Sequence, residues 1–262
     1  MNESCPREFA ALGQRLADTA GAVLLQYFRK PLDFADKPDE SPVTQADREA
    51  ESRMREAIAS TFPDHGVIGE EHGRDRADAE YVWVLDPIDG TKAFISGIPV
   101  FGTLIALLRN GRPILGVVDQ PVSRERWVGA AGQETTLNGE PVRVSPRGGL
   151  KDAVLWSTSP HMFDGDPQEA AAYARLRQSV KFVHYGGECY QYAMLASGFI
   201  DIVVEADMGV YDYCALVPVV QGAGGAITDW QGAALGLDSG GRVVAAASTG
   251  LHDAARRILE SR

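Results

Sequence analysis

Residues 83–92 read Trp-Val-Leu-Asp-Pro-Ile-Asp-Gly-Thr-Lys, an apolar strand that runs into two aspartates at a sharp bend. Proline fixes its own φ angle and glycine admits conformations that other residues avoid, so we expect the chain to turn here. Asp86 and Asp89 would then share one bend, with the carbonyl of Ile88 exposed between them. Carboxylate and carbonyl oxygens are ligands for hard cations such as Mg²⁺, which keep several waters when bound. The stretch therefore predicts a partial metal site with positions left for water and substrate.

The amides that follow this bend predict a site for an anion. Gly90 and Thr91 would begin a short helix, and the unpaired N–H groups of a helix start favour a phosphate. An alternative interpretation is purely structural, because Asp-Pro and Asp-Gly are common turn dipeptides and Asp86 would then only cap the bend.

Three acids elsewhere in the sequence are candidates for the same site. Glu70 follows an expected strand at 67–69, although a glutamate in that position is also typical of surface charge. Asp212 stands between a glycine loop and an apolar helix, where N-capping is the usual alternative role. Asp47 has the capping-box spacing from Thr44, and it could also orient the hydroxyl of Thr91 toward an attacking water.

The remaining pattern predicts two halves of one compact unit. The boundary lies near residue 148, so that residues 1–147 carry Glu70 and the 86–91 motif, and residues 148–262 carry Asp212 and the residues that select the substrate. The first half reads as helices with a mostly antiparallel sheet, and the second as alternating strands and helices. Expected helices are 9–27, 44–60, 167–178, 189–196, one from 212 and one from 252; expected strands are 67–69, 81–85, 103–108, 113–118, 126–130, 142–144, 153–157, 181–184, 200–205, 226–229 and 243–247.

Composition excludes several classes of protein. The chain has 262 residues, a formal net charge of −11 and three cysteines, so it can build a core without disulfides and is a poor match for a nucleic-acid backbone. Its apolar stretches are too short for a membrane helix, and no export signal is evident, so we expect a cytoplasmic protein without a membrane partner. Residues 222–227 lack the third glycine of a dinucleotide fingerprint, and neither a nucleophile elbow nor a zinc-binding histidine pair occurs. The two aspartates are also one residue too far apart for the nucleophile and acid of a haloacid-dehalogenase phosphatase.

Taken together, the blocks at 69–71, 86–91 and 211–225 resemble the inositol monophosphatase family over nearly the whole length. The resemblance implies an α+β fold, the layered α-β-α-β-α sandwich of the inositol monophosphatase and fructose-bisphosphatase type, and a homodimer. It implies water attack on a small phosphate monoester with Mg²⁺ as cofactor, without a covalent intermediate. Its implied metal ligands are Glu70, Asp86, the Ile88 carbonyl, Asp89 and Asp212; its catalytic residues are Glu70, Asp47 and Thr91; and its substrate-binding residues are Asp89, Gly90, Thr91, Glu188, Glu205 and Asp212.

Within that family, residues 89–107 and 184–190 look most like the histidinol-phosphate phosphatase branch, although Glu188 stands where that branch often has an aspartate. Histidinol phosphate carries an ammonium and an imidazole, for which Glu188 and Glu205 would be suitable partners. The resemblance thus implies hydrolysis of L-histidinol phosphate in histidine biosynthesis. Two alternatives stay open, an inositol-1-phosphate or broader sugar- or nucleotide-phosphate phosphatase, and a catalytically silent protein that binds an anion. Lys92 and His184 are further candidates, as a phosphate partner and as an unexplained histidine at a strand end.

Overall fold

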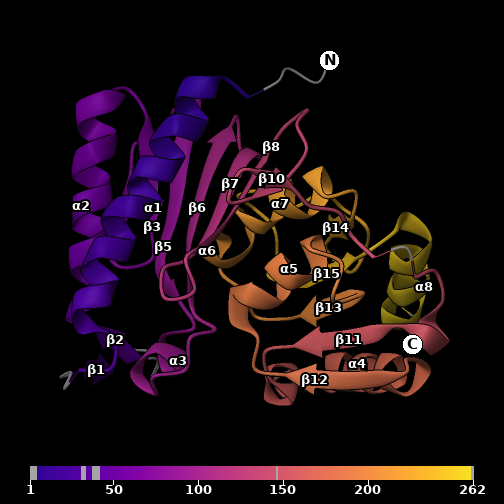
Figure 1. The fold of residues 1–262 in the computed structure, drawn as a ribbon. Coiled ribbons are helices and arrows are strands. Elements are labelled where there is room, and N and C mark those ends of the chain that lie inside the picture. Colours follow the sequence, from indigo (N-terminus) through magenta and orange to yellow (C-terminus); the bar gives the residue numbers. More distant parts are fainter. Residues whose placement is uncertain (1–4, 31–33, 37–41, 146, 261–262) are drawn as a thin grey trace.

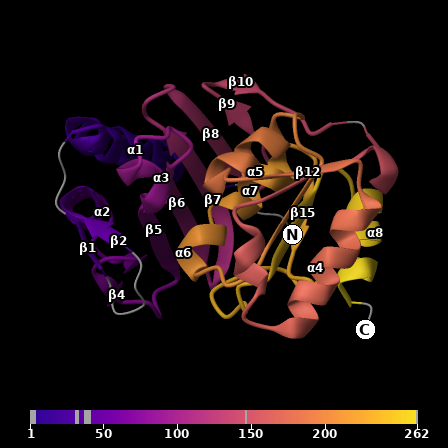
Figure 2. The same ribbon diagram turned by 90° about the horizontal axis from the view of Figure 1, so that it is seen from below.

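The computed structural model describes residues 5–30, 34–36, 42–145 and 147–260, which form alternating layers of helices and sheets (Figure 1). An eight-stranded sheet and a five-stranded sheet enclose one layer of helices, and further helices cover the outer face of each sheet. Figure 2 shows the same order from below. The α+β layered sandwich that the sequence predicts is confirmed.

The outer helices on the larger sheet are α1 (Arg7–Tyr27) and α2 (Gln45–Thr61). Leu12, Leu16 and Ala20 of α1 are fully buried, as the spacing of three and four residues predicts. The start of α2 is a capping box, in which the Thr44 hydroxyl accepts from the Ala46 amide and Asp47 accepts from the Thr44 amide. This cap fixes where α2 begins, beside the short helix α3 (Thr91–Ile95).

The larger sheet has the strand order β10-β9-β8-β7-β6-β5-β3-β4, and its one parallel pair is β3 with β5. Side chains alternate along β5: Val82 and Val84 face the helices between the sheets, and Trp83 and Leu85 face α1 and α2. A small ribbon of β1 and β2 lies apart from this sheet. The strands are β1 (Phe34–Asp36), β2 (Pro42–Thr44), β3 (Gly66–Gly69), β4 (Gly73–Asp75), β5 (Tyr81–Asp89), β6 (Gly102–Arg109), β7 (Arg112–Gln120), β8 (Glu125–Ala130), β9 (Thr136–Leu137) and β10 (Glu140–Pro141).

Helices α5 (Glu188–Ala196), α6 (Val210–Tyr213) and α7 (Leu216–Gly222) fill the layer between the sheets. Glycines on the larger sheet allow α7 to approach closely. A Cβ atom on Gly116 would lie 1.9 Å from the carbonyl oxygen of Ala215, and one on Gly129 would lie 2.4 Å from that of Pro218. Backbone is therefore packed directly on backbone where the segment containing Asp212 meets the sheet.

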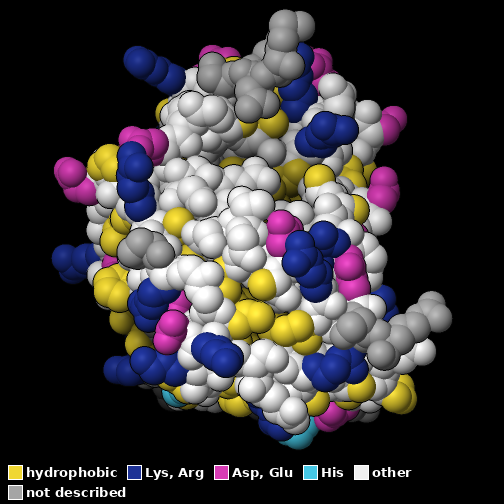
Figure 3. All heavy atoms as spheres, turned by 90° about the vertical axis from the view of Figure 1, so that its right-hand side faces the viewer, with side chains coloured by type: hydrophobic (Ala, Val, Ile, Leu, Met, Phe, Trp, Pro, Cys, Tyr) yellow, Lys and Arg dark blue, Asp and Glu magenta, His cyan; other side chains and the backbone are white. Residues whose placement is uncertain are grey.

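The smaller sheet has the order β12-β11-β13-β15-β14, with two parallel and two antiparallel pairs. Helices α4 (Pro167–Ser179) and α8 (Thr249–Glu260) cover its outer face, where basic, acidic and apolar side chains are interspersed (Figure 3). None of the helices within the described residues has the length and apolar character needed to cross a membrane. The strands are β11 (Val154–Ser157), β12 (Phe182–Tyr185), β13 (Ile202–Glu205), β14 (Ala226–Thr228) and β15 (Val243–Ala246), and two 3-10 helices cover Leu150–Asp152 and Pro160–Phe163.

Most expected ends shift by one or two residues, α8 begins three residues before 252, and three further differences concern residues 142–144, β5 and α6. Residues 142–144 form no strand, because the Val142 amide donates to Thr135 whereas the Val144 amide donates to Ala223 beyond α7, so no single partner strand exists. Strand β5 continues through Asp89 instead of ending at 85, and α6 begins two residues before Asp212.

Candidate active site

An irregularity in β5 brings the two aspartates of the motif to one side of the sheet. Asp86 pairs with Leu104 of β6, and Asp89 pairs with Gly102, so β5 contains one more residue than its partner between these positions. Residues three apart on a regular strand point to opposite faces, and one extra residue restores the same face. The bend predicted from Pro87 is therefore a bulge within a strand, with the Pro87 carbonyl held by the Thr103 hydroxyl at 2.8 Å.

Asp212 joins this pair from the other half of the chain. Carboxylate oxygens of Asp86, Asp89 and Asp212 all lie within 4.8 Å of one another. Asp212 also accepts from the Gly209 amide at 2.6 Å and so caps α6. The two roles that the sequence left open for Asp212 are thus compatible, because a carboxylate has a second oxygen to offer.

Each aspartate is oriented by a backbone hydrogen bond. Asp86 is 1% exposed and accepts from the Ile88 amide at 2.9 Å. The Ile88 carbonyl accepts from the Thr91 hydroxyl at 3.1 Å. Asp89 accepts from the amide of Cys189, at the start of α5, at 2.5 Å. That last contact spans 100 residues and connects α5 to the motif at residues 86–91, and no sequence pattern indicated it.

Glu70 lies beside the cluster because β3 and β5 are parallel neighbours. Its amide donates to the Leu85 carbonyl at 3.2 Å, and its side chain is hydrogen-bonded to Asp86. Four acids from three separate stretches of the sequence therefore meet beside the carboxyl ends of β3 and β5.

The electrostatics of this cluster favour a bound cation. Burial raises the pKa of Asp86 well above its usual value, and the charges of Glu70, Asp89 and Asp212 raise it further. Burial also raises the pKa of Asp89 to about 6 and that of Asp212 well above its usual value. Converging buried carboxylates repel one another and are costly to ionise unless positive charge compensates them. An all-oxygen set of this kind fits a hard divalent metal.

Asp47 is buried and accepts from both the amide and the hydroxyl of Thr44, at 2.9 and 2.5 Å. Burial raises its pKa to about 6, with a further contribution from the charge of Glu71. Capping of α2 is therefore its structural role, as the spacing predicts, while the Thr91 hydroxyl is directed to Ile88. Helix α3 contacts β2, the strand that leads into α2, so Thr91 and Asp47 lie on elements that both contact β2.

The two glutamates assigned to the substrate lie next to this cluster. Glu205 is 3% exposed, and its Oε1 accepts from the Thr158 amide at 3.0 Å and from Gln191 Nε2 at 2.8 Å. Burial raises the pKa of Glu205 to about 7. Burial and the charge of Asp89 raise the pKa of Glu188 to about 8, and the charge of Glu205 adds to this, whereas Lys92 opposes it.

Glu188 is held over the expected phosphate site by a costly backbone conformation. Its φ is 46°, which side chains other than glycine rarely adopt. A Cβ atom on Gly90 would lie 2.7 Å from the Glu188 Cγ, so Gly90, with a φ of 85°, leaves the space that this side chain occupies. Strain of this kind is commonly stored at functional sites.

The other candidates have clear surroundings. His184 is exposed on β12 with its ring 4.3 Å from that of Trp156, which gives it a packing role. Lys92 is exposed, and its charge acts on Glu188. No sequence pattern indicated Thr158, Gln191 or Glu51, because their contacts join segments far apart in the chain.

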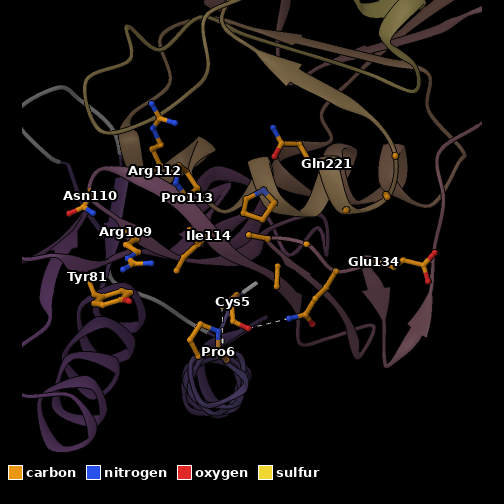
Figure 4. A pocket seen from close by; sticks show the side chains of 18 of the residues that line it. Cys5, Pro6, Tyr81, Arg109, Asn110, Arg112, Pro113, Ile114, Glu134 and Gln221 are labelled. Carbon is orange, nitrogen blue, oxygen red and sulfur yellow. Dashed lines mark hydrogen bonds between the residues drawn. The ribbon is translucent and has the colours of Figure 1, made fainter. Parts of the chain in front are cut away.

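A cavity of 1380 Å³ lies elsewhere, at the opposite end of β5 (Figure 4). Its lining includes Tyr81, Arg109 and Arg112. Because Tyr81 begins β5, this cavity is about 16 Å along the strand from Asp86. Its size therefore does not identify the reaction site.

The comparisons with known proteins agree with this geometry. The inositol monophosphatase family model matches residues 6–262. The bifunctional phosphatase IMPL2, a chloroplastic protein of Arabidopsis thaliana, is 49% identical over 261 residues, which cover 96% of this chain and 75% of that protein. A histidinol-phosphatase of Chlorobaculum parvum is 36% identical over 236 residues, which cover 89% and 90% of the two chains. A solved structure of an inositol monophosphatase from Zymomonas mobilis has a TM-score of 0.90 at 42% identity, and covers 99% of this chain and 100% of that one. The chain belongs to the inositol monophosphatase family of phosphatases.

Proposed function

We propose that this protein is a Mg²⁺-dependent phosphomonoesterase that hydrolyses L-histidinol phosphate to L-histidinol and phosphate. The convergence of Asp86, Asp89 and Asp212, with Glu70 bonded to Asp86, is the observation that carries the reaction type. Bound Mg²⁺ would lower the pKa of a coordinated water and neutralise charge on the phosphate.

The residues of the chain would hold the metal, the phosphate and the attacking water in place. Asp86, Asp89, Asp212, Glu70 and the Ile88 carbonyl would hold the metal. The amides of Gly90 and Thr91 would receive phosphate oxygens at the start of α3. Asp47 and the Thr91 hydroxyl would orient the attacking water, whose oxygen bonds to phosphorus as the ester P–O bond breaks. The leaving oxygen takes a proton and departs as the alcohol.

Two carboxylates beside the cluster, the buried Glu205 and the half-buried Glu188, support a cationic substrate. Burial and the charge of Asp89 raise the pKa of both glutamates above its usual value, and the charge of Glu205 raises that of Glu188 further. A substrate ammonium or imidazolium would relieve this repulsion, whereas a neutral polyol would not. The 36% identity to a protein named histidinol-phosphatase supports the same choice.

Inositol-1-phosphate hydrolysis is the second candidate. The 42% identity to a solved inositol monophosphatase favours it, and the carboxylate of Glu205 would accept hydrogen bonds from sugar hydroxyls. We also propose a homodimer in the cytoplasm, which light scattering of the purified protein and localisation of a tagged chain would test.

Substrate competition tests the proposal directly. Phosphate release is measured with histidinol phosphate, inositol 1-phosphate, fructose bisphosphate and a nucleotide monophosphate, each with Mg²⁺ and with EDTA. We expect the highest kcat/KM for histidinol phosphate and no turnover in EDTA. A preference for inositol 1-phosphate would establish the second candidate instead, and turnover in EDTA would exclude the metal mechanism.

A further inference from the structure

Glu51 of α2 is a buried carboxylate with one partner on its own helix and two on the loop after β3. It is 0% exposed, and its Oε2 accepts from the Glu71 amide at 2.8 Å. Its Oε1 accepts from the His72 amide at 3.1 Å and from Arg55 Nε at 2.7 Å. A buried charge with three donors is held in one geometry, because loss of any donor leaves charge uncompensated.

The Glu51 carboxylate also lies in close contact with the end of β3. A Cβ atom on Gly69 would lie 2.0 Å from Oε1, 2.3 Å from Cδ and 2.6 Å from Oε2 of Glu51. Glu51 therefore contacts the backbone on both sides of Glu70, at residue 69 before it and at residues 71 and 72 after it. The Glu70 amide is fixed to Leu85 of β5 at the same time.

We propose that Glu51 is a positioning residue for Glu70, and that it sets the metal affinity of the site by fixing the backbone of residues 69–72. This extends the proposed function, since it assigns a role in the same metal site. Arg55 also donates to the Gly73 carbonyl, so the contacts made by Glu51 and Arg55 together extend to the start of β4. Glu51 contacts no reacting group. It acts by fixing the orientation of the Glu70 side chain toward Asp86.

Metal binding without substrate tests this role. Calorimetric titration with Mg²⁺ alone is performed on the full chain and on Glu51→Gln, which keeps the side-chain shape but replaces one acceptor oxygen with a donor. Partners that orient metal ligands typically contribute ten- to a hundredfold in affinity, so we expect the Kd for Mg²⁺ to rise about tenfold or more. Glu56→Gln is the matched control, because Glu56 is exposed on the same helix. It should leave the Kd unchanged.

A double-mutant cycle separates positioning from general destabilisation. In a Glu70→Gln background, Glu51→Gln should change the Mg²⁺ Kd less than twofold, because the ligand that it orients is already impaired. If Glu51→Gln does not fold, Arg55→Gln serves instead, since it removes the Arg55 bonds to Glu51 and Gly73 but leaves the Glu71 and His72 amides bonded to Glu51. We expect the Kd for Mg²⁺ to rise about threefold in this variant.

Either of two results would overturn the proposal: a lowered melting temperature with an unchanged Mg²⁺ Kd, or equal effects in the presence and absence of Glu70. Failure of the proposed function would look different. In that case the wild-type chain would bind Mg²⁺ and respond to Glu51→Gln, yet release no phosphate from histidinol phosphate.

Discussion

Gly116→Ala probes the packing that brings Asp212 to the cluster. The added Cβ would lie 1.9 Å from the Ala215 carbonyl oxygen, 2.8 Å from its carbon and 3.1 Å from its Cα. All three atoms are backbone, so no side chain can rotate away. Ordinary contact begins near 3.4 Å, and the segment between α6 and α7 must therefore retreat by about 1.5 Å.

That displacement has two measurable costs. Overpacking in a closed layer lowers the free energy of unfolding by about 1–3 kcal/mol, which urea denaturation followed by circular dichroism measures. Ala215 is three residues from Asp212, so the shift also moves one carboxylate away from Asp86 and Asp89. We expect the calorimetric Kd for Mg²⁺ to rise at least tenfold.

Gly240→Ala is the matched control, since a Cβ at Gly240 would meet no atom within 4 Å. We expect Gly240→Ala to change neither the free energy of unfolding nor the Kd for Mg²⁺ by more than experimental error. If Gly116→Ala bound Mg²⁺ as tightly as the wild type, the argument that α7 packing positions Asp212 would be refuted.

Three further predictions concern the charged groups. Asp212→Asn should lose Mg²⁺ binding yet raise the metal-free melting temperature, because it keeps an acceptor for the helix cap and removes one of the repelling charges; a lower melting temperature would contradict this. Glu188→Gln should raise the KM for histidinol phosphate about tenfold at nearly constant kcat, and Glu205→Gln should act similarly; equal loss with inositol 1-phosphate would argue against cation recognition. Burial lowers the pKa of His65, whose Nδ1 accepts from the Trp83 indole at 3.1 Å. Its contribution to stability is therefore fully present above the unfolded pKa of 6.5 and is lost as pH falls below 6.5 and through the lower folded pKa. The free energy of unfolding, measured in urea at pH 7.5 and 5.5, should decrease less for His65→Gln than for the wild type. An identical decrease would exclude His65 as a source of the pH dependence.

Local chemistry made the bend and the proximity of Asp86 to Asp89 predictable, because Pro87 and Gly90 act through their own backbone preferences. The bulge itself was not predictable, because Pro and Gly in a sequence usually indicate the end of a strand. Pairing with β6 keeps β5 extended through Asp89, and that partner is chosen by the whole sheet. The three-residue segment at 142–144 alternates like a strand, but its amides bond to two different parts of the chain.

The role of Glu51 could not be predicted from the sequence for a related reason. It stands four residues from Asp47 and from Arg55, a spacing typical of a solvated helix face. Its actual partners, the amides of Glu71 and His72, lie about twenty residues away in the chain. The sequence alone does not show which face of α2 meets the loop after β3, so nothing in it distinguished Glu51 from a solvated glutamate.

Anomalous diffraction from a crystal soaked in Mn²⁺, a substitute for Mg²⁺ with strong anomalous scattering, would test the metal site most directly. The geometry predicts difference peaks within coordination distance of Asp86, Asp89 and Asp212, with Glu70 and the Ile88 carbonyl as further ligands. An ordered crystal with no peak among these oxygens, or with its peaks elsewhere in the molecule, would contradict the account.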